Sequence, residues 1–195
     1  MKPMRIFVAG ASGAIGRQLV PLLVKAGHDV AGMTRSPEKT QVIKAMGAEA
    51  VVCDVFDAES LTAAVTDFNP DIVIHQLTDL PRRVAAVPFK LFGLNRIRKT
   101  GTDNLLAAAK AANVDRVVAQ SIAFKVPGFA QRAVDYLEMA VLAAGGVVLR
   151  YGQFYGEGTW FAQRPKKGPT VNVKDAAKQT VEYLDAKSGV YVVAN

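Results

Sequence analysis

Short apolar runs rich in β-branched residues alternate along this chain with longer stretches whose apolar residues recur at helical spacing. The runs have the length of strands and cover residues 5–9, 28–33, 50–52, 71–75, 116–119, 147–149 and 190–193. The stretches between them predict helices over 14–26, 37–46, 58–67, 88–112, 130–144 and 173–186. Two segments, 125–128 and 156–170, contain glycine, proline and lysine and predict loops.

The repeated order of strand then helix determines the expected fold. Continuous apolar strands joined by helices form a parallel sheet that is covered on both faces. With right-handed crossovers, the predicted fold class is α/β, a doubly wound and mostly parallel sheet of the Rossmann type. We expect about seven strands, with helices on both faces of the sheet.

Three positions mark the expected helices more closely. Pro21 lies inside the first helix, where it removes one backbone hydrogen bond and should bend the helix. Ser36 is the expected N-cap of the second helix, with Pro37 at its first position. Asp57 is the expected N-cap of the third.

Composition limits the class of protein. The 195 residues are half hydrophobic and 21% charged, which is typical of a globular domain. No apolar stretch approaches the length of a membrane span, and charged and apolar residues alternate from Lys2 to Phe7, so we expect neither a membrane segment nor a secretory signal. The single cysteine, Cys53, permits no internal disulfide, and the expected compartment is the cytoplasm.

The formal net charge of +7 favours anionic ligands in general. Basic residues gather at Arg82–Arg83, at Arg96, Arg98 and Lys99, and at Arg164, Lys166 and Lys167. No aromatic residues interleave with these clusters, as a single-strand binding surface would require. We interpret them as solvated patches and expect no nucleic-acid partner.

The stretch "RIFVAGASGAIGRQLV" carries the clearest chemical signal. Gly10, Gly13 and Gly16 lie between the first strand and the first helix, where backbone N–H groups and the helix dipole attract phosphate. Gly10 would make the tight turn, Gly13 would let a pyrophosphate approach, and Gly16 would let the helix pack closely. Ser12 could add a hydroxyl donor. The alternative is a glycine-rich turn without a ligand, because the spacing is G-x-x-G-x-x-G rather than G-x-G-x-x-G.

The end of the second strand indicates which dinucleotide binds. An acidic residue there would bind the ribose 2′-hydroxyl of NAD, whereas arginine suits the 2′-phosphate of NADP. Thr34 and Arg35 occupy this place, and Arg17 is a second candidate for the phosphate. The sequence therefore favours NADP(H) over NAD(H), although Arg35 could also be a solvated loop residue.

Later strand ends complete the predicted cofactor site. Asp54 could accept a hydrogen bond from the adenine amino group while Val55 packs on the ring, or Asp54 could simply cap its loop. The segment after the fourth strand would run beside the nicotinamide ribose. The predicted cofactor-binding residues are Gly10, Ser12, Gly13, Ala14, Ile15, Gly16, Arg17, Thr34, Arg35, Asp54, Val55, Gln76, Leu77 and Thr78. Two histidines and an isolated cysteine predict no metal site.

Taken together, the chain resembles the extended and atypical short-chain dehydrogenases/reductases, in their NAD-dependent epimerase/dehydratase branch. The resemblance runs over nearly the whole chain and rests on "GASGAIGRQLV", "MTRSPEK", "VCDVFDAESL", "GTDNLLAAAKAANVDRVV", "QSIAF", "VVLRYGQFYGEGT" and "VNVKDAA". It implies a nicotinamide cofactor and hydride chemistry on a carbonyl, alcohol or sugar-like small molecule. It also implies a homodimer formed through the helices at 88–112 and 130–144.

The resemblance fails at the proton-transfer residues. The family carries a Tyr-x-x-x-Lys pair on the helix after the fifth strand, but Ala130 and Val134 stand at these positions here, and Arg98 replaces the family asparagine. Ser121 can take the role of the serine that orients the substrate oxygen. Tyr151 is a candidate proton donor near the substrate, whereas Tyr155 belongs to the family's structural turn.

Three functions remain open from the sequence. The first is an NADP(H)-dependent oxidoreductase or epimerase-type enzyme with Ser121 and Tyr151 as candidate catalytic residues. The second is a dinucleotide-binding or redox-sensing protein without turnover, which the missing pair favours. The third is a shortened scaffold that kept the fold and lost activity. We expect one dinucleotide-binding domain over residues 1–195, with a reduced or missing substrate lobe.

Overall fold

The computed structural model describes residues 2–78 and 87–195. The basic pair Arg82–Arg83 lies outside the described residues. Seven strands form one parallel sheet in the order β3-β2-β1-β4-β5-β6-β9. They are β1 (Arg5–Ala9), β2 (Asp29–Thr34), β3 (Glu49–Val52), β4 (Ile72–His75), β5 (Arg116–Ile122), β6 (Val147–Tyr151) and β9 (Gly189–Val193). The predicted fold class is confirmed.

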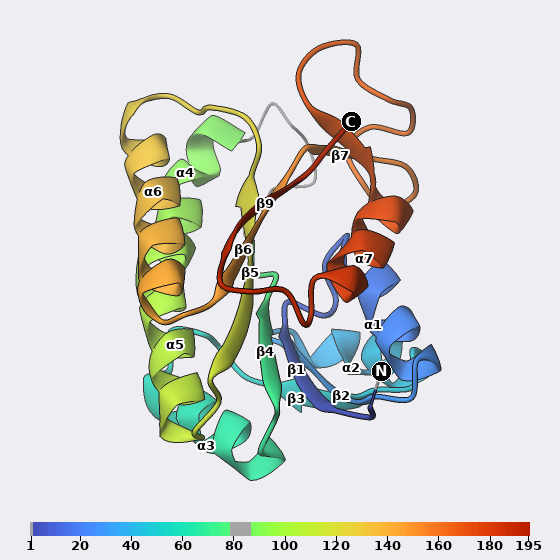
Figure 1. Ribbon diagram of the computed structural model, residues 1–195, viewed down its shortest axis with the longest axis vertical. Helices are drawn as coiled ribbons and strands as arrows, with labels where there is room; N and C mark the ends of the chain where they lie inside the picture. The colour runs from blue at the N-terminus through green and yellow to red at the C-terminus, as the bar shows by residue number, and fades with distance from the viewer. Residues whose placement is uncertain (1, 79–86) are drawn as a thin grey trace.

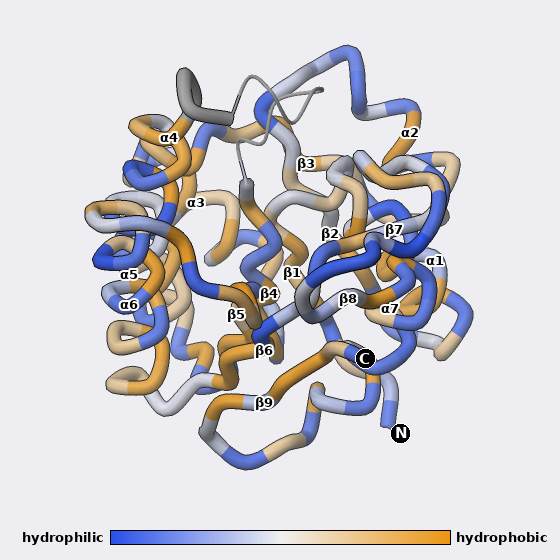
Figure 2. The backbone as a smooth tube through the Cα atoms, turned by 90° about the horizontal axis from the view of Figure 1, so that it is seen from above, coloured by the Kyte–Doolittle hydropathy of each residue, from blue (hydrophilic) through white to orange (hydrophobic). Residues whose placement is uncertain are grey.

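Helices cover both faces of this sheet, as Figures 1 and 2 show from two directions. One layer contains α3 (Ala58–Phe68), α4 (Val87–Arg96), α5 (Thr102–Ala111) and α6 (Gly128–Ala143). The other contains α1 (Gly16–Lys25), α2 (Thr40–Ala45) and α7 (Val173–Glu182). No helix in the described part of the chain is long and apolar enough to cross a membrane.

Three predicted elements differ in detail. The helix expected over 88–112 is divided by a π-helical turn at Ile97–Gly101. The second helix begins as a 3₁₀ turn, Pro37–Lys39, and the Ser36 side chain makes no capping hydrogen bond. The segment expected as a loop ends in a short strand, β8 (Thr170–Asn172), which pairs in parallel with β7 (Gln153–Tyr155). Asp57 does cap α3, since its carboxylate accepts the Ser60 N–H.

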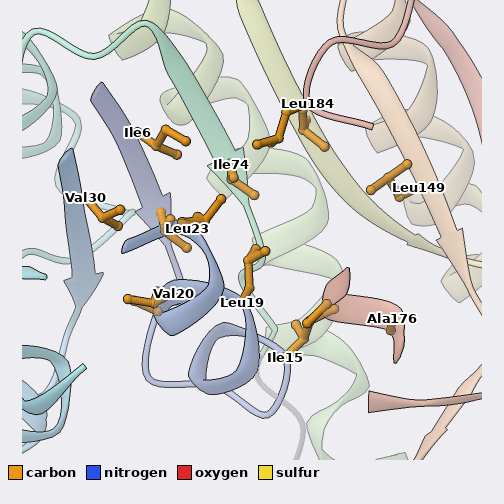
Figure 3. Packing of buried hydrophobic residues seen from close by; sticks show 14 of the residues in the cluster. Ile6, Ile15, Leu19, Val20, Leu23, Val30, Ile74, Leu149, Ala176 and Leu184 are labelled. Atoms are coloured by element: carbon orange, nitrogen blue, oxygen red, sulfur yellow. The ribbon is translucent and has the colours of Figure 1, made fainter. Parts of the chain in front are cut away.

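The larger apolar core lies between the sheet and the α1/α7 layer. Leu19 and Leu23 of α1 are fully buried against Ile6 and Ile74 of the central strands (Figure 3). A second cluster under α3 and α5 includes Phe7 and Leu105. Burying apolar side chains on both faces fixes β1 and β4 side by side at the centre of the sheet, and their carboxyl ends form the edge that carries the site.

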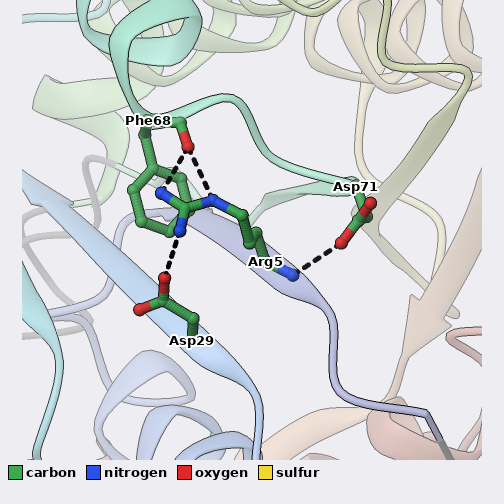
Figure 4. A network of polar contacts seen from close by, with 4 residues as sticks. All are labelled: Arg5, Asp29, Phe68 and Asp71. Carbon is green, nitrogen blue, oxygen red and sulfur yellow. Dashed lines mark hydrogen bonds and ion pairs between the residues drawn. The ribbon is translucent and has the colours of Figure 1, made fainter.

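Polar contacts around Arg5 stabilise the other end of the central strands, where β1 and β2 begin (Figure 4). Its guanidinium donates two hydrogen bonds to the carbonyl of Phe68, at 2.9 and 2.7 Å, and pairs with Asp29 at 2.6 Å. Its backbone N–H donates to Asp71 at 2.7 Å. These contacts join the starts of β1 and β2 to the turn before β4, so the charged residues at this edge have a structural role.

Candidate functional site

The cleft at the carboxyl ends of the strands has a volume of about 870 Å³ and lies where the strand order reverses between β1 and β4. In open parallel sheets ligands bind at this point. The cleft brings together most of the predicted residues: Gly10, Ser12, Gly13, Ala14, Thr34, Arg35, Asp54, Val55, Gln76, Leu77, Thr78, Ser121 and Tyr151. Ile15, Gly16 and Arg17 do not line it.

The three glycines of the first loop have different roles. Gly10 adopts φ +93°, and a Cβ there would lie 2.6 Å from the Gln76 carbonyl oxygen. A Cβ on Gly16 would lie 2.5 Å from the carbonyl oxygens of Gly10 and Ala11, so Gly16 packs against the loop itself. Gly13 lines the cleft, and its added Cβ would meet only the Gly10 oxygen, at 3.2 Å. Gly13 is therefore the glycine that leaves room for a ligand.

The start of α1 fits an anionic group. No side chain caps its N-terminus, and its first turn contains no acidic residue. Ala14 lines the cleft just before this terminus, while the Ile15 side chain is buried in the core. Unpaired N–H groups and the positive end of the dipole are thus available where the loop approaches the cleft. Ile15 can contribute only through its backbone.

The two predicted arginines lie in different places. Arg35 is exposed and lines the cleft just after β2. Arg17 donates a hydrogen bond from its Nε to the Ser12 carbonyl, at 3.0 Å, and does not line the cleft. The alternative assignment of the 2′-phosphate to Arg17 is therefore disfavoured by its contacts, which hold the glycine loop instead.

Contacts within the loops shape the part of the cleft next to β2 and β3. The hydroxyls of Ser12 and Thr34 lie 3.2 Å apart, and Thr34 also accepts the Ser36 N–H. One carboxylate oxygen of Asp54 accepts the Phe56 N–H at 3.0 Å, which is the loop-capping role. Val55 is buried under α5 and presents only a small surface.

Ser121 lies at the other end of the cleft and contacts an ion pair of which the carboxylate, Glu138, is buried. Its hydroxyl donates to Glu138 of α6, at 2.5 Å, and Glu138 accepts two hydrogen bonds from Arg150 of β6. The hydrogen bonds that Arg150 donates to the Glu138 carboxylate raise the pKa of Arg150. Because its proton is directed to Glu138, the Ser121 hydroxyl can act toward a ligand in the cleft only as an acceptor.

Tyr151 belongs to a directed chain of hydrogen bonds. Thr180 donates to the Ala176 carbonyl, at 2.7 Å, so the Tyr151 hydroxyl, 2.6 Å from the Thr180 hydroxyl, must donate to it. The amide nitrogen of Gln76 donates to Tyr151 at 3.3 Å. Burial raises the pKa of Tyr151 to about 12. With its proton donated to Thr180 and this pKa, Tyr151 is poorly suited to proton transfer at neutral pH.

The hydrogen bonds around Tyr151 predict that Tyr151→Phe destabilises the fold. Removal of the hydroxyl leaves the buried Gln76 amide without its acceptor, so we expect the free energy of unfolding to fall by about 1–2 kcal/mol. Urea denaturation of the variant beside the original protein measures this. An unchanged midpoint would show that the Tyr151 hydroxyl is not part of the buried chain.

The sequence did not identify the other residues that define this end. The sequence does not indicate Glu138 and Arg150 as a pair, and Gln120 lies just beyond the predicted end of its strand at 119. The helix α6 buries Ala130 and Val134, and Tyr136 donates its hydroxyl to Asp103 outside the cleft, which raises its pKa. A carboxylate within the apolar face of a helix, as at Glu138, is the signal that could have revealed the pair.

The fold, the glycine loop and the cleft at the switch point define a dinucleotide-binding protein of the Rossmann type. Residues 10–145 match the NAD(P)H-binding family, and the chain belongs to this family. The resemblance to NAD-dependent epimerases and dehydratases, which the sequence motifs indicate, is also confirmed.

Among curated relatives, a 3-diazoavenalumate denitrifying reductase from a Streptomyces species is 39% identical over 189 residues, covering 82% of this chain and 59% of the relative. A UDP-glucose 4-epimerase from Mycolicibacterium smegmatis is 32% identical over 132 residues, covering 64% of this chain and 41% of the relative. The chain thus spans less than two thirds of the length of these relatives.

Solved structures share the fold. The Bordetella bronchiseptica enzyme WbmH in complex with NAD+ superposes with a TM-score of 0.79 at 20% identity, covering 98% of this chain and 75% of that one. A UDP-glucose 4-epimerase from Thermotoga maritima gives a TM-score of 0.81 at 18% identity, with 98% and 77% covered. At these identities the likeness is one of fold.

Proposed function

We propose that this protein is an NAD(P)H-dependent reductase that prefers NADP(H) and acts on a small molecule. The observation that carries the proposal is the continuity of the cleft, from Gly13 and Arg35 past Gln76 to Ser121. When bound, the dinucleotide supplies a hydride from its reduced nicotinamide. The chain supplies the uncapped helix start for the diphosphate and a separate uncharged end for the substrate.

The relatives support reduction as the chemistry. The Streptomyces relative is named as a reductase, and a relative from Stigmatella aurantiaca, 32% identical over 115 residues, is named as a ketoreductase. A reductase needs the cofactor cleft and a substrate position at the ends of β5 and β6. One dinucleotide-binding domain over residues 1–195, with a reduced substrate lobe, is part of this proposal.

Arg35 is the proposed reader of the 2′-phosphate, because an exposed guanidinium at the end of β2 meets phosphate as a planar charged fork. We expect Arg35→Asp to weaken NADPH binding about 10- to 150-fold and to change NADH binding less than about threefold, since removing a charged contact costs roughly 1.5–3 kcal/mol. Fluorescence titration of both cofactors measures the preference.

Lys44→Asp is the matched control. It also replaces a positive by a negative side chain, but Lys44 is exposed on α2 and does not line the cleft. It should leave both affinities unchanged within about twofold. Equal weakening of NADPH and NADH by Arg35→Asp would contradict a phosphate-reading role for Arg35.

A second candidate function is dinucleotide binding without turnover. The buried Ala130 and Val134, at the positions of the family's tyrosine and lysine, favour it. One assay distinguishes the two functions: NADPH oxidation is measured in the presence of a panel of carbonyl and cationic acceptors. Binding without oxidation of NADPH by any acceptor would favour the second function.

We also propose that the protein forms a homodimer through the helices at 88–112 and 130–144. Phe92 of α4 and Met139 of α6 are large apolar side chains that are 83% and 63% exposed. The two helices pack against each other in one layer (Figure 1). A second copy of the chain would cover both side chains.

A further inference from the structure

The end of the cleft that would receive a substrate is formed by β5, β6 and the residues that follow them. We refer to the cleft-lining residues within 120–124 and 151–161 as the substrate end. Its hydroxyl-bearing members among the described residues are Ser121, Tyr151 and Thr159. None of the described residues that line this end carries a formal charge.

Each of these hydroxyls donates its proton within the protein. Ser121 donates to Glu138, and Tyr151 donates to Thr180. Thr159 lies 2.9 Å from the Gly156 carbonyl oxygen and 3.0 Å from that of Phe161, and donates to these acceptors. Reduction of a ketone places negative charge on oxygen and requires a donor there. The described residues of the substrate end provide no hydroxyl proton for that purpose.

Acceptor oxygens are present instead. The side-chain oxygens of Gln76 and Gln120 are buried without a hydrogen-bond donor among the described residues, although both side chains line the cleft. The Gln76 amide is oriented by its donation to Tyr151, which fixes the oxygen as the unpaired atom. Gln76 directly follows β4 and Gln120 lies in the neighbouring strand β5. Two residues earlier Ile74 pairs with Val118, so alternation places Gln76 and Gln120 on the same face of the sheet. Unpaired carbonyl dipoles in a poorly solvated site favour a donor or a positive charge.

Aromatic side chains form much of the remaining wall. Tyr151 and Phe154 pack with ring centroids 5.2 Å apart. The other aromatic side chains of the substrate end are Phe124, Trp160 and Phe161. Aromatic faces attract cations and stack on planar groups. The wall and the unpaired oxygens therefore favour the same kind of ligand, a planar cation.

We propose that the substrate is a planar cation conjugated to an aromatic ring, such as an iminium ion, that accepts hydride and becomes neutral without gaining a proton. This inference rests on the proposed reductase function. For an iminium ion, hydride from NAD(P)H forms a new C–H bond at the iminium carbon, and the π electrons of the C=N bond move to nitrogen. The products are a neutral amine and NAD(P)+, and no proton enters or leaves. Such a reaction does not need the family's tyrosine and lysine.

A matched pair of acceptors tests the reaction. N-methyl-3,4-dihydroisoquinolinium carries a permanent charge, and 1-tetralone is a neutral bicyclic ketone of similar size. With NADPH, we expect kcat/KM for the cation to exceed that for the ketone at least about 100-fold, the usual contribution of a general acid that the ketone would lack here. The rate for the cation should also be unchanged between about pH 6 and pH 9, because no proton is transferred.

A binding measurement provides a readout besides turnover. In the presence of NADP+, which cannot reduce either compound, calorimetry should show the cation binding at least about tenfold more tightly than the ketone. Gln76→Leu should remove most of this difference, and Gln120→Leu should reduce it. If Gln76→Leu does not fold, Gln120→Leu still provides the test, because Gln120 takes no part in the hydrogen bonds that join Gln76, Tyr151 and Thr180.

The outcomes separate the two proposals. NADPH binding together with equal or faster reduction of 1-tetralone would overturn the cationic substrate and leave the reductase standing. NADPH binding without reduction of the cation would also overturn it. Absence of NADPH and NADH binding would instead overturn the proposed function. Preference for the cation in both rate and affinity, lost in the glutamine variants, would support the inference.

Discussion

Gly13→Val is expected to raise the Kd for NADPH at least about 100-fold, which corresponds to nearly 3 kcal/mol of binding free energy. Gly13 lines the cleft beside the start of α1, so the valine methyl groups would occupy the space where the diphosphate must approach. A fluorescence titration with NADPH measures the affinity.

The fold should survive this substitution. Gly13 does not have a positive φ, and its added Cβ meets only one loop oxygen, at 3.2 Å. We expect the free energy of unfolding to fall by less than about 2 kcal/mol. Ala26→Val, at the exposed far end of α1, is the matched control and should bind NADPH normally. Unchanged NADPH affinity in a folded Gly13→Val variant would show that the loop holds no diphosphate.

Stability is expected to fall by roughly 3 kcal/mol between pH 6.5 and pH 4 because of His75. Its Nδ1 accepts the Leu77 N–H, so Nε2 carries the proton and donates to Thr102 at 3.1 Å. Burial lowers the pKa of this neutral ring from 6.5 to about 4. In that pH range the unfolded chain binds a proton at His75 and the folded chain does not, so acid favours unfolding. Above pH 6.5 neither state is protonated, and this contribution is constant.

NMR titration isolates His75 from other groups, because the chain has only two histidines. The second, His28, also has a lowered pKa through burial and adds to the trend. The His75 ring signals should stay at neutral-imidazole positions down to about pH 5. A midpoint near 6.5 would contradict a buried, hydrogen-bonded His75 and would remove its part of the acid instability.

Most of the fold was accessible from the sequence because each strand is a continuous apolar run between turn signals. The starts of β1, β5 and β6 agree with the prediction, and the glycine loop was located correctly. The π-helical turn at Ile97–Gly101 was missed because its apolar spacing resembles that of a helix. The pair β7 and β8 was missed because each strand has three residues and depends on distant partners, including hydrogen bonds between Thr170 and Asn195.

The substrate end was harder to predict because it depends on where two strands end. β5 continues to Ile122 and β6 to Tyr151, beyond the predicted ends at 119 and 149. Strand alternation then turns Ser121 toward α6, whereas Gln120 and Tyr151 turn toward the α1/α7 layer. Hydrogen bonds to Glu138 and Thr180 are tertiary contacts that sequence spacing does not encode. The cofactor half, by contrast, follows local turn and helix signals.

Calorimetric titration of the protein with NADPH, repeated with NADH, tests the central claim most directly. The cleft at the ends of β1, β2 and β4 predicts saturable binding of one dinucleotide per chain, with NADPH bound more tightly than NADH. Heat no greater than that of dilution with both cofactors, at concentrations up to about 1 mM where even weak specific affinity is detectable, would contradict the account.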